Sequence, residues 1–166
     1  MKRSLLILAC ALPMAVYAAD NPDSRFYKDA AEAGLAEVND ATLATQSATD
    51  PKLKDFANRM IKDHSAANDK LAALAGRKNL TLPTSPSVGQ MATHEKLKLE
   101  SGQTFDKAYI KDQISAHRAA VRLLRKEISA GKDPDAQDFA KSILPTVEHH
   151  LSAIEKIATA DGVSTK

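Results

Sequence analysis

Four segments of this chain, each about 25 residues long, carry apolar side chains at the three- and four-residue spacing of a helix. The spacing predicts helices over about 24–48, 51–75, 104–130 and 134–160. Asp50-Pro51 and Asp133-Pro134 mark two of the starts, because aspartate caps a helix and proline is favoured at its first position. No segment after residue 18 alternates as a β-strand does. We therefore expect an all-α chain built as a four-helix bundle.

The connections between these segments set the order of the helices. The first and second helices, and the third and fourth, are separated by only a few residues, which predicts two antiparallel hairpins. The connection from Gly76 to Gln103 can run from one end of the bundle to the other. It predicts a ferritin-like bundle with a long crossover between helices two and three, and a simple up-down-up-down bundle is the alternative. An amphipathic piece over Met91 to Leu99 is expected to cap the bundle.

The two hairpins repeat one string of residues. Asp50-Pro51-Lys52-Leu53-Lys54-Asp55-Phe56-Ala57 aligns with Asp133-Pro134-Asp135-Ala136-Gln137-Asp138-Phe139-Ala140. Asp-Pro is a common helix start and Phe-Ala a common core pair, so parts of the match follow from ordinary helix structure. A match at five of eight positions, followed each time by a core histidine, favours two pseudo-equivalent hairpins.

Residues 1–18 have the form of a secretory signal peptide. Met1-Lys2-Arg3 is a basic start, Leu5 to Val16 is apolar, and small residues precede Ala19. The apolar stretch is too short to span a bilayer as a stable helix. Cleavage after Ala18 would leave one domain over residues 19–166. The sequence therefore predicts an exported, periplasmic protein with no transmembrane segment.

The leader also holds the excess positive charge and the only cysteine. The chain has 23 Lys and Arg against 21 Asp and Glu, and the leader contains Lys2, Arg3 and no acid. Residues 19–166 therefore carry 21 charges of each sign, which gives no basic surface for nucleic acid. Cys10 lies in the leader, so the mature chain has no disulfide, no thiolate metal ligand and no c-type haem site.

Three of the five histidines lie at the centre of the apolar face of a predicted helix. They are His64, His117 and His150, each on a different helix, and Glu37 has the same position on the first helix. Counting from the helix ends puts all four near mid-bundle, with mismatches of about 3 and 4.5 Å within the two hairpins. Polar groups in a core cost free energy unless they bond each other or a metal. The sequence therefore predicts one site formed by these four side chains.

Strings in these helices are similar to a known family. They are Phe56-Ala57-x-x-Met60-Ile61-x-Asp63-His64, Phe105-Asp106-x-x-Tyr109 followed by His117, and Leu144-Pro145-x-x-x-x-His149-His150-Leu151. From about Phe26 to Ile157 the chain resembles the domain of unknown function 4142. This family lies within the ferritin-like group, occurs in bacterial exported proteins and is often labelled a predicted outer-membrane protein. The resemblance implies a ferritin-like four-helix bundle, and it brings no established reaction.

The chain departs from ferritin-like di-iron proteins, which use a Glu-x-x-His pair on two helices. The residues three positions before the core histidines are Ile61, Ile114 and Val147. The bridging carboxylates of a di-iron centre are therefore missing from the sequence. Neither oxygen activation nor iron mineralisation is expected from the fold.

Three interpretations of the Glu37 and histidine set remain open, and one of them is a small-ligand or redox enzyme. Three imidazoles and a carboxylate complete a tetrahedral zinc shell, and the same donors suit copper or iron. A closed set of four protein ligands favours a structural or storage site over an enzyme. Alternatively, the set is a hydrogen-bonded core with a trapped water. The protein would then be a non-catalytic envelope or stress-related protein that binds a protein partner or forms a homo-oligomer.

Two further histidines lie away from the centre of the apolar faces. His149 lies at the edge of the same face as His150, so we treat it as an additional candidate ligand that is partly exposed. His94 lies on the connecting segment and is expected to face solvent.

Overall fold

The computed structural model describes residues 23–164, and these residues form five helices. The helices are α1 (Ser24–Ser47), α2 (Pro51–Arg77), α3 (Val88–Lys98), α4 (Gly102–Ala130) and α5 (Pro134–Ala160). The four long helices begin and end within two residues of the ranges expected from the sequence. The leader expected over residues 1–18, with Cys10, lies outside the described residues.

The repeated Asp-Pro pairs begin the second helix of each hairpin. Asp50 accepts a hydrogen bond from the backbone N–H of Lys52 at 2.9 Å, and Asp133 accepts one from Asp135 at 3.1 Å. Pro51 and Pro134 hold the first helical position, where no N–H partner is needed. Each pair therefore caps a helix directly after a tight turn, and this turn folds the helix back on the preceding one.

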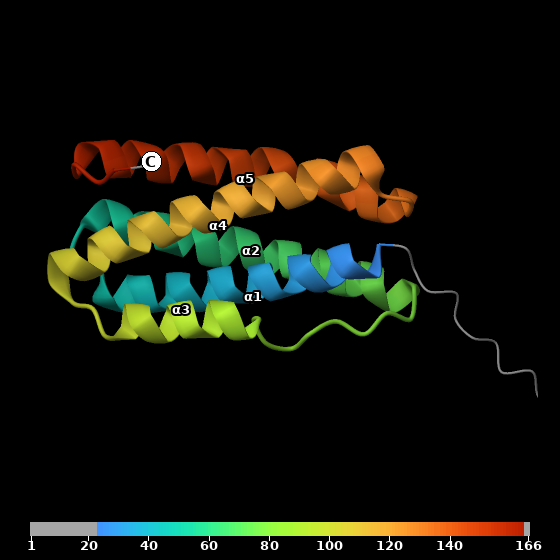
Figure 1. Cartoon of the computed structure of the whole chain (residues 1–166), viewed down its shortest axis with the longest axis horizontal. Helices are drawn as coiled ribbons and strands as arrows, with labels where there is room; N and C mark the ends of the chain where they lie inside the picture. Colours follow the sequence, from blue (N-terminus) through green and yellow to red (C-terminus); the bar gives the residue numbers. More distant parts are fainter. Residues whose placement is uncertain (1–22, 165–166) are drawn as a thin grey trace, which may run out of the picture.

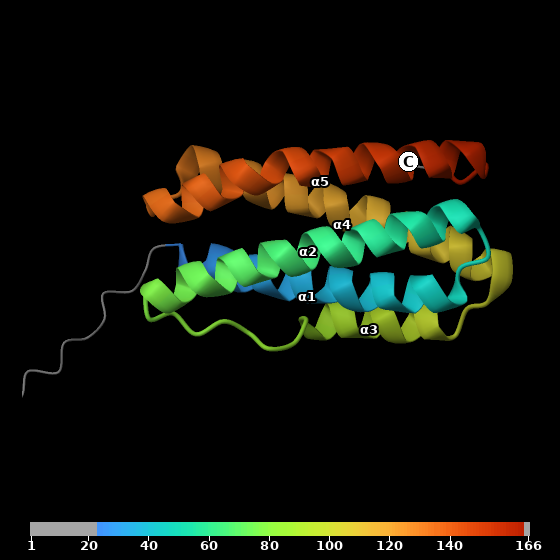
Figure 2. The same cartoon turned by 180° about the vertical axis from the view of Figure 1, so that it is seen from behind.

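The four long helices form a bundle with ferritin-like connectivity. α1 and α2 run antiparallel, and so do α4 and α5 (Figure 1). The segment between α2 and α4 returns along the length of the bundle, so that α2 and α4 point the same way (Figure 2). The long crossover predicted from the sequence is therefore present, and the simple up-down-up-down alternative is wrong.

Helix α3 lies along the side of the bundle beside α1, not across its end (Figures 1 and 2). The expectation that this piece caps the bundle is therefore wrong, because the crossover has to follow the bundle lengthwise to reach the start of α4. A capping box between Ser87 and Gln90 begins the helix. His94 bonds Asp40 of α1 at 2.6 Å, and Leu97 is buried in the core. His94 is thus half-buried and paired, against the expectation that it faces solvent.

The apolar core is divided into two clusters along the bundle axis. On α1 the cluster at one end stops at Ala31 and the other begins at Ala41, and Glu37 lies in the interval. The same break occurs in the other three long helices, where the residues in the interval are His64, His117 and His150. The predicted site residues therefore occupy a polar layer, defined here by these four residues, between two apolar halves.

Asp106 of α4 fastens the first hairpin to the second. Its carboxylate accepts the backbone N–H of Thr49 at 2.9 Å and that of Asp50 at 3.1 Å, and it also bonds the Thr49 hydroxyl. These groups form the turn between α1 and α2, whose backbone donors have few other partners. Asp106 is itself buried, so the bonds are made away from water.

None of the described helices is both long and apolar enough to span a membrane.

We expect Asp106→Ala to destabilise the protein by roughly 2–4 kcal/mol, because it removes three bonds to a charged acceptor and leaves two backbone donors unpaired. Urea unfolding followed by circular dichroism measures the loss. Asp138→Ala, which removes an exposed carboxylate paired only with Lys141, is the matched control and should change stability by less than about 0.5 kcal/mol. Equal midpoints for the two variants would contradict the role of Asp106.

Candidate metal centre

Three histidines from three helices meet in the polar layer. His64 comes from α2, His117 from α4 and His150 from α5. One ring nitrogen of each lies within 4.8 Å of those of the other two. The ring centroids are 5.5–5.8 Å apart. His117 is 0% exposed and His150 1% exposed, while His64 is half-buried at the edge of the group. We call these three residues the histidine cluster.

In two of the cluster histidines, a hydrogen-bond acceptor outside the cluster determines which ring nitrogen carries the hydrogen. His117 Nδ1 lies 2.9 Å from the carbonyl oxygen of Gln113, which can only accept, so Nδ1 carries the hydrogen. His150 Nε2 lies 2.9 Å from Oδ2 of Asp63 and donates to this carboxylate in the same way. The lone pairs of the two neutral rings are therefore on His117 Nε2 and His150 Nδ1.

The nitrogens that bear these lone pairs have no hydrogen-bond partner within the described part of the chain. His117 Nε2, His150 Nδ1 and His64 Nε2 are all buried and unpaired. Buried polar atoms are nearly always bonded, because an unpaired one loses its hydration without compensation. Three buried nitrogens without partners in one cluster are typical of metal ligands in a protein that has not yet bound its metal.

Burial keeps the cluster uncharged at neutral pH. It lowers the pKa of His64 to about 3 and that of His117 to about 4, and repulsion from the neighbouring histidines adds to the effect. Burial also lowers the pKa of His150, although the bond to Asp63 opposes the shift. Neutral imidazole is the form that binds metal, so these rings are ready to coordinate at pH 7.

Glu37 lies in the same layer but outside the histidine cluster. Its Oε1 is 3.7 Å from His117 Nδ1, and its Oε2 accepts a 2.9 Å hydrogen bond from Gln113 Nε2. The carboxylate therefore approaches the protonated side of the His117 ring, whereas the free lone pair is on Nε2. Counting residues gave the level of Glu37 along the bundle, but not the direction of its side chain. The structure brings the three histidines together without the fourth expected ligand.

The carboxyl group of Glu37 is held in its neutral form. Burial raises its pKa to about 8, with further contributions from Asp112 and Asp40, while the Gln113 bond opposes the shift. At pH 7 Glu37 is therefore mostly protonated. It adds little negative charge to the layer unless a cation approaches.

Sequence reasoning missed two residues that orient the cluster. Gln113 lies one helical turn before His117 and contacts it through its backbone carbonyl, which no residue type signals in the sequence. Its buried side chain bonds Glu37 instead. Asp63 directly precedes His64 in the chain, yet it bonds His150 on the neighbouring helix. Carboxylates and carbonyls that hold the far nitrogen of a histidine are the usual second layer of metal sites.

His149 lies outside the histidine cluster, with its ring centroid 6.5 Å from that of His150. Its side chain is exposed, and its Nε2 lies 3.4 Å from a guanidinium nitrogen of Arg59. The structure therefore does not place this additional candidate ligand with His64, His117 and His150.

The surroundings of the cluster differ on its two sides. The ring of Phe56, from the repeated string, lies 6.4 Å from that of His117 and 6.3 Å from that of His150, and it closes one side. A cavity of about 60 Å³ adjoins the cluster at His64, and Glu37 and several small side chains also line it. Gly34 of α1 belongs to this wall. A side chain at this position would collide with α2, because a Cβ there would lie 1.9 Å from the Asn68 side chain. α1 and α2 thus approach closely beside the site.

A family model described as Domain of unknown function (DUF4142) matches residues 9–157, so the chain belongs to this family. No curated protein matches the sequence significantly. The resemblance to the family inferred from the sequence strings is confirmed.

Solved structures with the same fold include two DUF305 proteins. A putative secreted protein from Streptomyces coelicolor aligns with a TM-score of 0.76 at 14% identity, over 89% of this chain and 97% of that one. A fragment from Deinococcus radiodurans aligns with a TM-score of 0.74 at 13% identity, over 83% and 95% of the two chains. A third structure, CopM in the Cu(II)-bound form, aligns with a TM-score of 0.68 at 18% identity, over 83% and 96%. At these identities the alignments establish the fold alone.

The buried histidines should make the metal-free protein sensitive to acid. Because the pKa of His117 is lower in the folded than in the unfolded state, its contribution to stability is present above pH 6.5 and is lost as the pH falls towards 4. We expect His117→Gln to reduce the slope of stability against pH in this window by about 1.4 kcal/mol per pH unit. Denaturant unfolding in the presence of a chelator measures the slope.

Glu37→Gln is the control with the opposite sign. A raised pKa in the folded state means that the contribution of Glu37 is present below pH 4.5 and is lost as the pH rises through 8. The parent should therefore lose this contribution between pH 5 and pH 8, and the variant has none to lose. The free energy of unfolding of the variant relative to that of the parent should be higher at pH 8 than at pH 5. Parallel pH profiles for the parent and both variants would contradict the buried, neutral state of the layer.

Proposed function

We propose that this member of the DUF4142 family binds a divalent transition-metal ion in the core of an exported helical bundle, through the three histidines of its cluster. The ligands would be His64 Nε2, His117 Nε2 and His150 Nδ1. One observation carries the proposal: three histidine rings converge, each has a buried nitrogen without a partner, and the other nitrogens of two of the rings are held by acceptors.

The donor set fits such an ion in number and kind. Three neutral imidazoles bind zinc, copper and iron, and a set without thiolates gives no preference for a softer ion. Nitrogens around a tetrahedral zinc lie about 3.3 Å apart at Zn–N distances of about 2.0–2.1 Å. One ring nitrogen of each histidine lies within 4.8 Å of the other two, so small rotations of the rings would bring the nitrogens to the spacing that a metal needs.

Copper is the metal we favour. Nitrogen sites hold Cu²⁺ more tightly than the other divalent ions of the first transition row. The fold is shared with CopM, whose solved structure is a Cu(II)-bound form. Asp63 would supply a negative charge to the site through His150, and Glu37 could release its proton to compensate the added charge beside His117.

The three-histidine set changes what the site can do. A fourth protein ligand would have closed the coordination shell, but Glu37 lies on the other side of His117. One coordination position would therefore remain for water or a small ligand, next to the cavity that His64 lines. We propose binding and not a reaction.

Binding should stabilise the native protein by mass action. At a metal concentration about a hundredfold above Kd we expect a gain of about 2.7 kcal/mol, seen as a higher Tm. The gain should persist at pH 6 and fade as the pH falls towards 4, because the pKa of His64 is about 3 and that of His117 about 4, so protons compete only there. His64→Ala should abolish the gain in a protein that remains helical. His149→Ala, which removes an exposed histidine outside the cluster, should retain the gain in full.

A wild-type melting curve unmoved by zinc, copper and iron at pH 7.5 would reject metal binding. It would favour the alternative, a metal-free histidine core in an envelope protein. Elemental analysis of untagged protein from the periplasm tests the same point without added metal, and bound metal there should be lost in His64→Ala but not in His149→Ala.

We also propose export through cleavage after Ala18, for which the leader-like residues 1–18 are the support. The processed chain should be recovered in the periplasmic fraction, and its intact mass should correspond to a start at Ala19. Recovery of the chain in washed membranes with Met1 retained would contradict this.

A further inference from the structure

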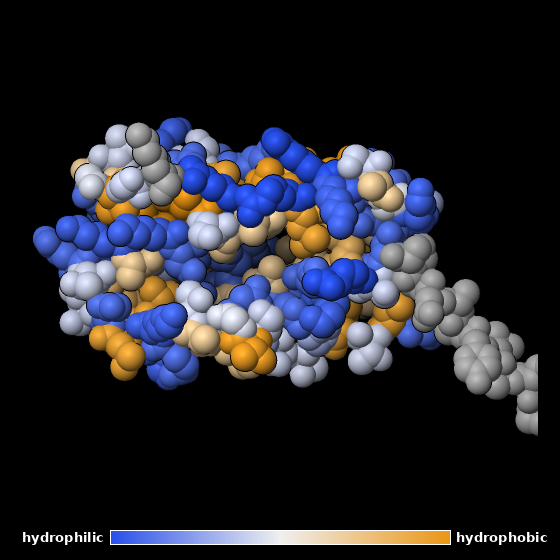
Figure 3. Space-filling model, viewed as in Figure 1, coloured by the Kyte–Doolittle hydropathy of each residue, from blue (hydrophilic) through white to orange (hydrophobic). Residues whose placement is uncertain are grey.

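A groove of about 420 Å³ runs along the face between α1 and α4, beside the start of α3. Figure 3 shows the molecule hollowed on this face. The groove is wide because alanines line both of its walls, among them Ala33 and Ala36 on α1 and Ala116 and Ala119 on α4. Small side chains leave open space where larger ones would fill the gap between the two hairpins.

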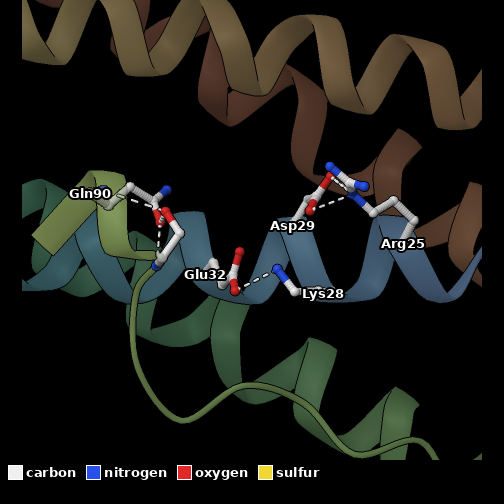
Figure 4. A network of polar contacts seen from close by, with 6 residues as sticks. Arg25, Lys28, Asp29, Glu32 and Gln90 are labelled. Atoms are coloured by element: carbon white, nitrogen blue, oxygen red, sulfur yellow. Dashed lines mark hydrogen bonds and ion pairs between the residues drawn. The ribbon is translucent and has the colours of Figure 1, made fainter.

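Within residues 23–164, all four ionisable side chains that line this groove are acidic, and Glu37 among them is mostly protonated at pH 7. Asp29, Glu37, Asp40 and Asp112 line it, and none of the described residues that line it is a lysine or an arginine. Asp29 is neutralised by Arg25, which bonds it at 2.8 Å (Figure 4), and Asp40 is paired with His94. Asp112 has no ion-pair partner within the described residues, and burial together with the charge of Asp40 raises its pKa to about 6. It is therefore mostly ionised at pH 7.

A buried hydroxyl beside these carboxylates also has no partner. Tyr109 is completely buried, and its Oη makes no hydrogen bond within the described residues. The charges of Glu37, Asp40 and Asp112 contribute to raising the pKa of this phenol, so these carboxylates lie near it. Tyr109 is not among the described residues that line the groove, so its hydroxyl belongs to the polar surroundings of these carboxylates and not to the route itself.

The groove continues towards the histidine cluster. Glu37, Ala33, Ala120 and Leu123 line both the groove and the 60 Å³ cavity whose wall includes His64. Glu37 stands at this junction, only 6% exposed, with its Oε1 3.7 Å from His117 Nδ1. A line of carboxylates therefore leads from the surface to a group that touches the cluster.

We infer that the acidic groove between α1 and α4 is the access route by which a divalent cation reaches the histidine cluster, with Asp40 and Asp112 attracting the ion and Glu37 passing it inward. The inference rests on the metal binding proposed above. The carboxylates act on the rate, because a charged channel raises the local cation concentration and the frequency of productive encounters. The affinity is set by the three histidines.

Stopped-flow mixing of the full-length mature protein with micromolar Cu²⁺, followed by the copper–imidazole absorption, tests the route at about pH 7. At about 0.01 M ionic strength we expect the Asp40→Asn, Asp112→Asn double variant to bind with a kon at least about threefold lower than the wild type. The difference should vanish at about 1 M salt, where the Debye length is about 3 Å. Because koff should fall as well, Kd should change less than kon.

Two further variants test whether the slowing belongs to the groove itself. The matched control is Asp55→Asn with Asp69→Asn, which removes the same charge from exposed positions on α2 outside the groove and should lower kon much less than the groove variant does. Ala119→Leu narrows the groove without altering charge and should slow binding and release alike at every salt concentration.

The outcomes distinguish the route from the site. Equal slowing by the control pair, or unchanged kon in both groove variants with Cu²⁺ still bound at equilibrium, would overturn the route and leave the histidine site standing. A higher Kd with unchanged kon would also overturn it, since the carboxylates would then be ligands. A wild type that binds no Cu²⁺ at equilibrium would overturn the site and the route together.

Discussion

The hydrogen bonds from His117 to the Gln113 carbonyl and from His150 to Asp63 determine what the middle of this bundle can do. Each bond fixes a proton on the outer nitrogen of a ring, and the inner nitrogen is then left with its lone pair. Without these two bonds the rings could rotate and donate hydrogen bonds to one another, and no ring nitrogen in the layer would be left without a partner. With them, burial lowers the pKa of the rings and keeps them neutral, so an arriving proton is a poor competitor for a metal ion.

The crossover has consequences that reach this layer. Because it runs lengthwise, α2 and α4 are parallel, and the four polar positions come from all four long helices at one level. The same crossover carries α3 along α1, where the His94–Asp40 bond fixes it at one edge of the acidic groove. Helix α3 therefore forms part of the connection between the two hairpins and also part of the edge of the groove.

Much of this arrangement could be predicted from the sequence, because helix spacing and caps are local properties. Asp50-Pro51 and Asp133-Pro134 gave the starts of α2 and α5, and counting from them put three histidines at one level. The direction of a side chain is not local, so counting along the helices could not show which side of His117 the carboxyl group of Glu37 approaches. Its carboxylate turns towards Gln113, a residue of another helix that no spacing within α1 identifies. The path of α3 depended in the same way on Asp40 and on burial of Leu97.

The division of the apolar core has a consequence for how the molecule opens. Each apolar cluster draws side chains from all four long helices, so the two halves of the core are the two ends of the bundle and not its two hairpins. The sequence repeat suggests that the two hairpins are the units of the fold. The packing instead defines the two ends of the bundle as the units, with the polar layer as the boundary between them. Fluctuations that loosen one end need not disturb the other, because between them lies a layer with few apolar contacts to lose. An ion held by three helices in that layer would join the two ends and make them unfold as one cooperative body.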